Sequence, residues 1–356
     1  MTLDGGRLNF GFDRFSGLYL WALFIIVFGI LKPSTFLTLD TAHSVASQQA
    51  ISAMLGLALI VPLAAGVYDL SIGATANLAA VTAAWLQTNH GMPILPAIAI
   101  SILAGVAIGI VNGFVTVVLG VNPFIATLGM ATIVSAVQNI VSGQEQPLPP
   151  TAPFWSKLTQ HQVFGFQIVV LYLVVLAVIL WWVLDHTPAG RYLYAVGGNS
   201  DAARLSGVRT QRWVWLSLIA SGGVSALAGV LFCSLSGPSL TFGPALLLPA
   251  FAAAFLGSTQ LKPGRFNVWG TLLAVYILAT GVRGMELLTS VSWLNDMFNG
   301  VALIAAVAFA VWRQDRVRHP RFGDAAPDDT APGHGDPGSG EPSLAASPRT
   351  DPGASS

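Results

Sequence analysis

Long apolar runs separated by short polar stretches extend through most of the chain. They predict helices over 16–31, 51–86, 94–119, from 124 onward, 166–184, 213–235, 245–256, 268–282 and 300–312. A membrane-crossing helix needs about 20 mostly apolar residues. There is room for roughly ten such crossings. The pattern therefore predicts an all-α polytopic membrane protein with about ten transmembrane helices.

Two of the apolar runs are irregular. The run over 51–86 is interrupted by GVYDLSIG at 66–73, and the run over 245–256 is too short to cross a membrane comfortably. A carboxylate is costly in lipid, and irregular backbone is tolerated at membrane depth only where protein shields it. We therefore expect the chain to break or turn at Asp69, and some helices to be broken or re-entrant.

The composition agrees with this fold class. Hydrophobic residues make up 54% of the chain and charged residues 9%, whereas charged residues are about a quarter of a soluble domain. The net charge is zero and no basic block is present, which argues against a nucleic-acid partner. The single cysteine, Cys233, cannot form an intramolecular disulfide. No small-residue cleavage site follows the first apolar run, so we expect a retained first helix.

The segment 185–212 is the main polar stretch between apolar regions. It contains, in order, residues that break, cap and end helices: Gly197 and Gly198, then Asn199 or Ser200, then Gly207. Asp201 is expected in the first helical turn, where it faces the helix dipole favourably. The pattern predicts a short amphipathic helix over 201–206 between glycine hinges. An ordinary structured loop and a docking helix both fit these residues.

Positive residues indicate the orientation, because arginine and lysine favour cytoplasmic loops. With ten crossings, four clusters fall on one side: Arg7 and Arg14; Arg191, Arg204, Arg209 and Arg212; Lys262 and Arg265; Arg313, Arg316, Arg318 and Arg321. Lys32, Lys157 and Arg283 fall on the other side. We therefore predict cytoplasmic N and C termini, with a cytoplasmic arm over 1–15, a transmembrane domain over 16–312 and a disordered cytoplasmic tail over 313–356.

Catalytic and metal-binding patterns are missing from the sequence. A phosphate-binding loop needs a Gly-Lys-Ser/Thr triplet, and none of Lys32, Lys157 and Lys262 has that setting. The six histidines are dispersed without metal-ligand spacing. No Gly-x-Ser-x-Gly elbow occurs. We therefore expect a pore or carrier and not an enzyme, with no catalytic residues, metal or cofactor in this chain.

The predicted transmembrane helices contain few polar groups that invite a function. Asp69 is the one candidate for an ion relay. A carboxylate that accepts hydrogen bonds from a broken helix end or from the Ser71 hydroxyl fits equally well. In the helix over 94–119, Gly105, Gly109 and Gly113 recur at every fourth position, which predicts close approach of another helix. Asn112 on that helix needs a partner inside the bundle.

Three motifs carry a resemblance to a known family. They are GVYDLSIGATANLAA at 66–80, GIVNGFVTVVLGVNPFIATLGM at 109–130, and TPAGRYLYAVGGNSDAARLSGV at 187–208. Over about 18–311 the chain resembles the permease subunits of carbohydrate-importing ABC transporters, of the ribose, xylose and galactose type, within the branched-chain amino acid and sugar permease family. The third motif is the most specific, because its AVGGN, AAR and SGV elements resemble the sugar branch.

The resemblance implies roles for particular residues. The segment over 190–208 is expected to dock in a groove of an ATPase subunit, with coupling residues Arg191, Gly197, Gly198, Asn199, Ala202, Ala203 and Gly207. The translocation path is expected to include Asp69, Ser71, Asn77, Asn112, Asn122 and Thr127. The implied partners are an ABC ATPase that holds ATP and Mg, a second permease copy, identical or paralogous, an extracytoplasmic solute-binding protein and membrane lipid.

Two stretches depart from the family pattern. Val67 and Tyr68 stand where the family commonly has a second glycine and an isoleucine, and GSTQLKPGRFNVWGT at 257–271 replaces a glycine-rich stretch. Both departures bear on which solute is moved. Our leading hypothesis is an importer permease for a monosaccharide or related polyol in the bacterial plasma membrane. The alternatives are the same fold importing nucleosides or branched-chain amino acids, or a self-sufficient secondary carrier or channel that uses Asp69.

Overall fold

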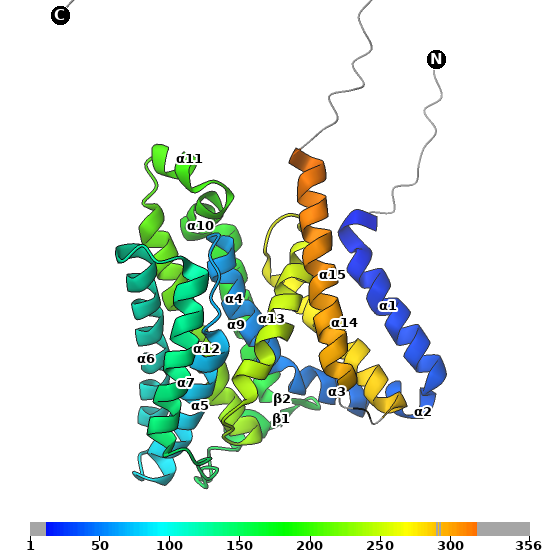
Figure 1. The fold of residues 1–356 in the computed structure, drawn as a ribbon. Coiled ribbons are helices and arrows are strands. Elements are labelled where there is room, and N and C mark those ends of the chain that lie inside the picture. The colour runs from blue at the N-terminus through cyan, green and yellow to red at the C-terminus, as the bar shows by residue number, and fades with distance from the viewer. Residues whose placement is uncertain (1–11, 290, 292, 319–356) are drawn as a thin grey trace, which may run out of the picture. The chain divides into compact units, whose positions relative to one another are not determined.

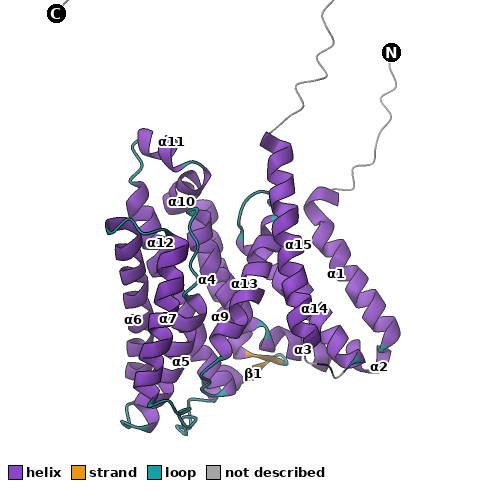
Figure 2. Ribbon diagram, viewed as in Figure 1, coloured by secondary structure: helices purple, strands orange, loops and turns teal. Residues whose placement is uncertain are grey.

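The fold is built from helices (Figures 1 and 2). The computed structural model describes residues 12–289, 291 and 293–318. Its elements are α1 (Phe12–Leu31), α2 (Pro33–Phe36), α3 (Leu39–Gln48), α4 (Ala50–Ala64), α5 (Ile72–Thr88), α6 (Ile94–Gly113), the π-helical turn η1 (Phe114–Val118), α7 (Pro123–Ser142), α8 (Lys157–Gln160), β1 (Gln162–Val163), β2 (Phe166–Gln167), α9 (Ile168–His186), α10 (Pro188–Gly198), α11 (Ser200–Leu205), α12 (Thr210–Ser236), α13 (Phe242–Ser258), α14 (Val268–Leu288) and α15 (Trp293–Arg318).

The helical, membrane-spanning class is confirmed for the described residues. Five helices there are long and apolar enough to cross a membrane, or six if α3 and α4, which meet at 41°, form one bent crossing. The segment 17–31 and α13 are shorter apolar helices. The total of about ten crossings and the cytoplasmic termini stay predictions. In the part of the chain that the structure describes, β1 and β2 are the only strands, and they pair antiparallel over two residues each.

The chain divides into two units, Met1–Asp315 and Arg316–Ser356. Of the second unit the structure describes 316–318, the end of α15. The predicted arm over 1–15 and disordered tail over 313–356 fall mostly outside the described residues and remain predictions there. Where the structure describes them both are wrong, because 12–15 belong to α1 and 313–318 belong to α15.

Most predicted helix boundaries agree with the structure, but the last two helices are longer than predicted. The apolar run predicted a helix that ends at Val282, whereas α14 continues to Leu288. The predicted helix over 300–312 is extended at both ends, because α15 covers Trp293–Arg318. Arg283 Nη1 lies 3.4 Å from Glu286 Oε2, three residues further along the same helix. Opposite charges at this spacing are neighbours on one helix face, so the charge does not end the helix.

The core is organised around α4. Every residue of α4 is buried, as expected for a helix that is apolar on all sides. α12 packs against α4, α5 and α6, while α13 and α14 also contact α4. Figure 1 shows α5, α6, α7 and α12 gathered beside α4. Helices α12, α13 and α14 therefore all pack against the same buried helix, α4.

The predicted glycine stripe of α6 lies against α12. A Cβ atom at Gly109 would lie 2.5 Å from the carbonyl oxygen of Leu218, and one at Gly105 would lie 2.5 Å from that of Gly222. Real Cβ contacts are not this short. The two helix backbones therefore touch along this stripe, as the sequence predicted.

The predicted break around Asp69 is confirmed. α4 ends at Ala64 and α5 begins at Ile72, and Gly66 has a left-handed φ of 78°, which glycine adopts without strain. We call 65–71 the unwound segment. Its Asp69 and Ser71 are each 1% exposed, so protein encloses the irregular backbone at these two residues, as the membrane interior requires, whereas Gly66 and Tyr68 are exposed.

The α6–α12 contact yields a test of the packing. Gly109→Ala is expected to lower the free energy of unfolding by roughly 1–3 kcal/mol, because the new methyl group meets the α12 backbone. Gly129→Ala on α7 is the matched control, since no atom lies within 4 Å of its Cβ position. Thermal unfolding of the purified chain in detergent measures both. Equal midpoints for the two variants would contradict the packing described.

Candidate functional site

The central polar segment folds into two short helices at one end of the bundle (Figure 1). α10 begins at Pro188 and ends at Gly198, and α11 follows directly. The Asn199 side chain caps α11 by accepting a 3.0 Å hydrogen bond from the Ala202 amide, and Asp201 lies in the first turn. Gly207 is left-handed with φ 83°. The predicted short helix is confirmed, shifted by one residue to 200–205.

The expected break at the glycine pair is confirmed, because Gly197 and Gly198 are the last two residues of α10 and the chain turns at Asn199. Gly197 has a further use. Its Cα lies 3.0 Å from the Cβ position of Gly66, and a Cβ at Gly197 would lie 2.9 Å from the Gly66 nitrogen. The backbone of α10 thus rests directly on the start of the unwound segment. Gly198 has open space around its Cβ position.

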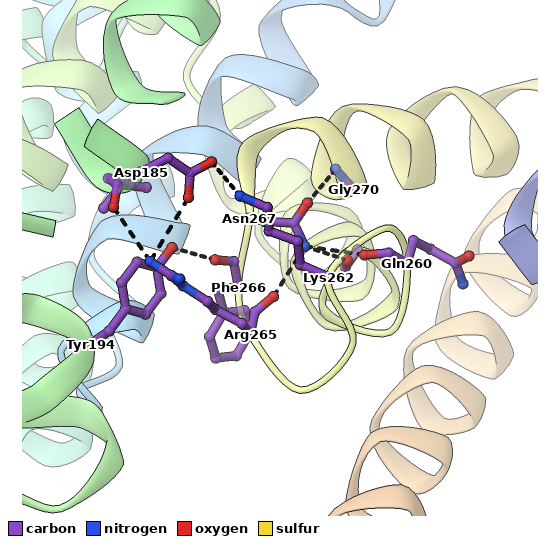
Figure 3. A network of polar contacts seen from close by, with 10 residues as sticks. Asp185, Tyr194, Gln260, Lys262, Arg265, Phe266, Asn267 and Gly270 are labelled. Atoms are coloured by element: carbon purple, nitrogen blue, oxygen red, sulfur yellow. Dashed lines mark hydrogen bonds and ion pairs between the residues drawn. The ribbon is translucent and has the colours of Figure 1, made fainter. Parts of the chain in front are cut away.

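A polar network also holds α10, through Tyr194, as Figure 3 shows. Asp185, at the end of α9, is bridged by Lys262 at 2.7 Å and by Arg265 at 3.8 Å. The Arg265 guanidinium carbon lies 3.5 Å from the ring centre of Tyr194 on α10. The Tyr194 hydroxyl donates a 2.5 Å hydrogen bond to the carbonyl oxygen of Phe266. We call these four side chains, of Asp185, Tyr194, Lys262 and Arg265, the clasp.

Electrostatics keep the clasp intact near neutral pH. Burial raises the pKa of Tyr194, and this outweighs the opposing effect of the nearby Arg265 charge. The phenol therefore stays protonated and remains a hydrogen-bond donor. The cation over its ring adds an attraction to the electron-rich ring face. The clasp joins α9, α10 and the loop between α13 and α14.

Asn267 shapes the loop that supplies the clasp. Its amide nitrogen donates to the carbonyl oxygens of Gly257, Gln260 and Arg265, at 3.2, 3.2 and 3.0 Å. Its amide oxygen accepts a 2.7 Å bond from Gly270 and so caps α14. From the sequence, this stretch was noted only as a departure from the family pattern. The asparagine directly before an apolar helical run was the signal that indicated a cap.

A pocket of about 700 Å³ opens where α10 meets the unwound segment. Its walls combine three regions far apart in the sequence: 65–67, 116–123 and 196–200, with 210–214 closing it. Gly197, Gly198 and Asn199 line it together with Asn122. The structure thus places predicted coupling residues beside one predicted path residue.

The unwound segment is bound to two neighbouring helices through side chains. Asp69 Oδ1 accepts hydrogen bonds from the Ser71 amide and hydroxyl, at 3.0 and 2.6 Å. Asn112 on α6 donates to the Ser71 hydroxyl oxygen at 2.8 Å. Thr127 on α7 accepts from the Leu70 amide at 3.1 Å. Four of the six predicted path residues therefore lie together.

The other two path residues lie elsewhere. Asn77 on α5 donates to Gln138 on α7 and, at 2.6 Å, to the Leu240 carbonyl oxygen, and it accepts from the Gly243 amide at 3.1 Å. It thus fastens the start of α13. Asn122 is exposed and caps α7 by accepting a 2.9 Å bond from Phe124. Of the coupling residues, Arg191 and Ala202 are exposed, while Ala203 is buried.

A family model for branched-chain amino acid transport systems, permease component, matches residues 41–307 of this chain. The chain belongs to this permease family. The match contains α4 to α14, the unwound segment, α10, α11 and the clasp. The resemblance stated from the three motifs is thereby confirmed, and the protein is a multi-pass membrane permease.

Curated relatives cover most of the permease. The chain is 31% identical to the fructose import permease protein of Rhizobium meliloti, over 83% of this chain and 84% of that one. It is 31% identical to the ribose import permease protein of Bacillus subtilis, over 82% and 90%. It is 27% identical to the D-allose transport system permease protein of Escherichia coli, over 83% and 91%. No solved structure matches the chain.

The contact between α10 and the unwound segment can be tested with two adjacent glycines. Gly197→Ala is expected to destabilise the permease by roughly 1–3 kcal/mol, because its methyl group meets the backbone of Ala64 and Gly66. Gly198→Ala is expected to leave the unfolding midpoint unchanged or slightly raised, because alanine favours the helix. Thermal unfolding in detergent compares them. A loss of stability in Gly198→Ala alone would contradict the placement of Gly197.

Proposed function

We propose that this chain is the membrane-spanning permease subunit of an ATP-driven importer for a monosaccharide or a related polyol. Permeases named for fructose, ribose and D-allose align with more than four fifths of it. The observation that carries the proposal is the contact of Gly197 with Gly66. This contact joins α10, in the segment proposed to dock on the ATPase, directly to the unwound segment between α4 and α5.

In this proposal ATP is hydrolysed by other subunits. The sequence contains no phosphate-binding loop, so ATP and Mg belong to a separate ABC ATPase. A second permease copy completes the pore, and an extracytoplasmic solute-binding protein delivers the sugar. The complex resides in the bacterial plasma membrane.

The geometry offers two routes for force from the ATPase. α11 presents Leu205, whose side chain is 87% exposed, as an apolar contact for the ATPase groove. Movement of α10 passes through Gly197 to the unwound segment, and through Tyr194 and Arg265 to the loop before α14. The bundle can thereby alternate between outward-open and inward-open cavities.

The proposed topology has about ten crossings with both termini in the cytoplasm. The clasp supports it, because it brings Lys262 and Arg265 to the same end as Arg191 and Arg204. Lys157 begins α8, which is fastened to the opposite end of α12 by a 2.8 Å hydrogen bond between Thr159 and Ser234. Positive residues therefore gather at the α10 end, which favours the cytoplasm.

Reconstitution tests the function. We expect proteoliposomes containing the permease, its ATPase and its solute-binding protein to accumulate radiolabelled ribose, fructose or allose only with ATP inside. Vesicles with the permease alone serve as the control, and leucine and adenosine are tested in parallel. Accumulation by the permease alone would overturn the importer proposal. Uptake of leucine or adenosine without any sugar would overturn the substrate class.

Cysteine labelling tests the orientation. In a Cys233→Ala background, a cysteine at exposed Ser200 is expected to react with an impermeant maleimide only from the cytoplasmic side. A cysteine at exposed Glu145, beyond the other end of α7, is expected to react only from outside. The reversed pattern would contradict the proposed topology.

A further inference from the structure

Buried oxygen atoms without hydrogen-bond donors gather around the unwound segment. Asp69, Asn112 and Ser221 come from this segment, α6 and α12, and each is at most 1% exposed. Among the described residues, Asp69 Oδ2, Asn112 Oδ1 and Ser221 Oγ have no hydrogen-bond partner. Unpaired buried acceptors are rare because each forfeits its hydration.

The hydrogen bonds of Ser71 determine which side-chain atom of Asn112 has no hydrogen-bond partner. The Ser71 hydroxyl has a single hydrogen, which it donates to Asp69 Oδ1 at 2.6 Å. Asn112 must therefore donate its amide nitrogen to Ser71, at 2.8 Å, and cannot be turned the other way. Its amide oxygen is thereby left as an acceptor. Asp69 Oδ1 already accepts hydrogen bonds from the Ser71 amide and hydroxyl. Asp69 Oδ2 is therefore the carboxylate oxygen without a hydrogen-bond partner.

Ser221 completes the set from the opposite helix. Its hydroxyl lies close enough to the Asp69 carboxylate to act on it as a hydrogen-bond donor, although no contact of full hydrogen-bond geometry joins them and Ser221 Oγ accepts no hydrogen bond. Thr75 and Ser225, one helical turn further along α5 and α12, are also buried and unpartnered. The two helices touch there, because a Cβ at Gly229 would lie 2.9 Å from the Cα of Ala76.

The charge of Asp69 needs compensation. Among the described residues the ion pairs involve Asp185, Asp201 and Glu286 but not Asp69. A buried carboxylate without an opposite charge beside it is very costly, so either a proton or a cation neutralises Asp69. The described residues form no group of three or more His, Cys, Asp or Glu side chains, which argues against a transition-metal site.

The ligand set suits an alkali-metal cation. Hard cations prefer oxygen ligands, and divalent calcium usually takes several carboxylates among six to eight of them. Here one carboxylate stands among neutral oxygens, which matches a single positive charge. The carboxyl end of α4 lies just before the segment, and such helix ends and unwound carbonyls favour cations.

We propose that Asp69 Oδ2, Asn112 Oδ1 and Ser221 Oγ bind an alkali-metal cation of the sodium type. The ion joins the unwound segment to α6 and α12 and neutralises the only charge in it. The inference does not depend on the transported solute, and it assigns the ion a binding site and not a role as cargo.

Binding can be measured on the purified full-length chain in detergent. We expect the thermal unfolding midpoint to rise by several degrees when choline chloride is replaced by NaCl at constant ionic strength, because a ligand of the folded state stabilises it by mass action. We expect saturable binding of radioactive sodium in a scintillation proximity assay. A parallel titration with KCl ranks the two ions.

Two substitutions on α12 give the sharpest control. Ser221→Ala removes a proposed ligand and is expected to weaken the sodium response roughly tenfold in apparent affinity. Ser217→Ala lies one turn away, is equally buried, and removes a hydroxyl that bonds its own helix at 2.7 Å. It is expected to leave the sodium titration unchanged.

Asp69→Asn is expected to abolish the sodium response. Equal midpoints in sodium, potassium and choline chloride would overturn the proposal and leave a protonated Asp69. An unchanged sodium response in Asp69→Asn would also overturn it. If Asp69→Asn fails to fold, the pair of serine variants decides, since an identical titration for both contradicts the site.

Discussion

The backbone of the unwound segment must be satisfied inside the protein, and much of the surrounding structure follows from this constraint. Pro62 on α4 accepts bonds from the amides of Ala65 and Val67 through its carbonyl oxygen, at 2.9 and 3.0 Å. Thr127 accepts from the Leu70 amide. Such pairing is obligatory where water is excluded. The Pro62 carbonyl and the Thr127 hydroxyl therefore accept hydrogen bonds from backbone amides where α4 stops inside the protein.

This constraint explains where the chain could be predicted from its sequence. The break was visible because a lone carboxylate and a glycine interrupt an apolar run, and the α6 glycine stripe was visible from its period of four. The cap of α11 followed from Asn199. Each of these features is local, because the residue type itself limits the backbone or the lipid exposure.

Features that depend on distant partners were not predicted. At Gly197 the end of a helix was predicted, but its contact with Gly66 was not. A glycine indicates either freedom of the backbone or close approach of another segment, and only the position of Gly66 shows that both hold here. Asp185, Tyr194 and Arg265 are separated in sequence, so the clasp has no local pattern. Asn77 and Asp69 were both predicted as polar residues of one path, but the Asn77 amide is used in hydrogen bonds to Gln138 on α7 and to the start of α13. The end of α14 was missed because the predicted helix was ended with the apolar run at Val282, whereas α14 continues through Arg283 and Glu286.

The two supports of α10 differ in kind, and this difference bears on how the permease can move. The contact at Gly197 is backbone on backbone, so it resists compression and transmits a push without adjustable side chains. The clasp consists of long side chains with an exposed lysine, whose ion pairs re-form over a range of separations at little cost. The contact at Gly197 therefore holds α10 to the unwound segment more rigidly than the clasp holds α10 to the loop before α14.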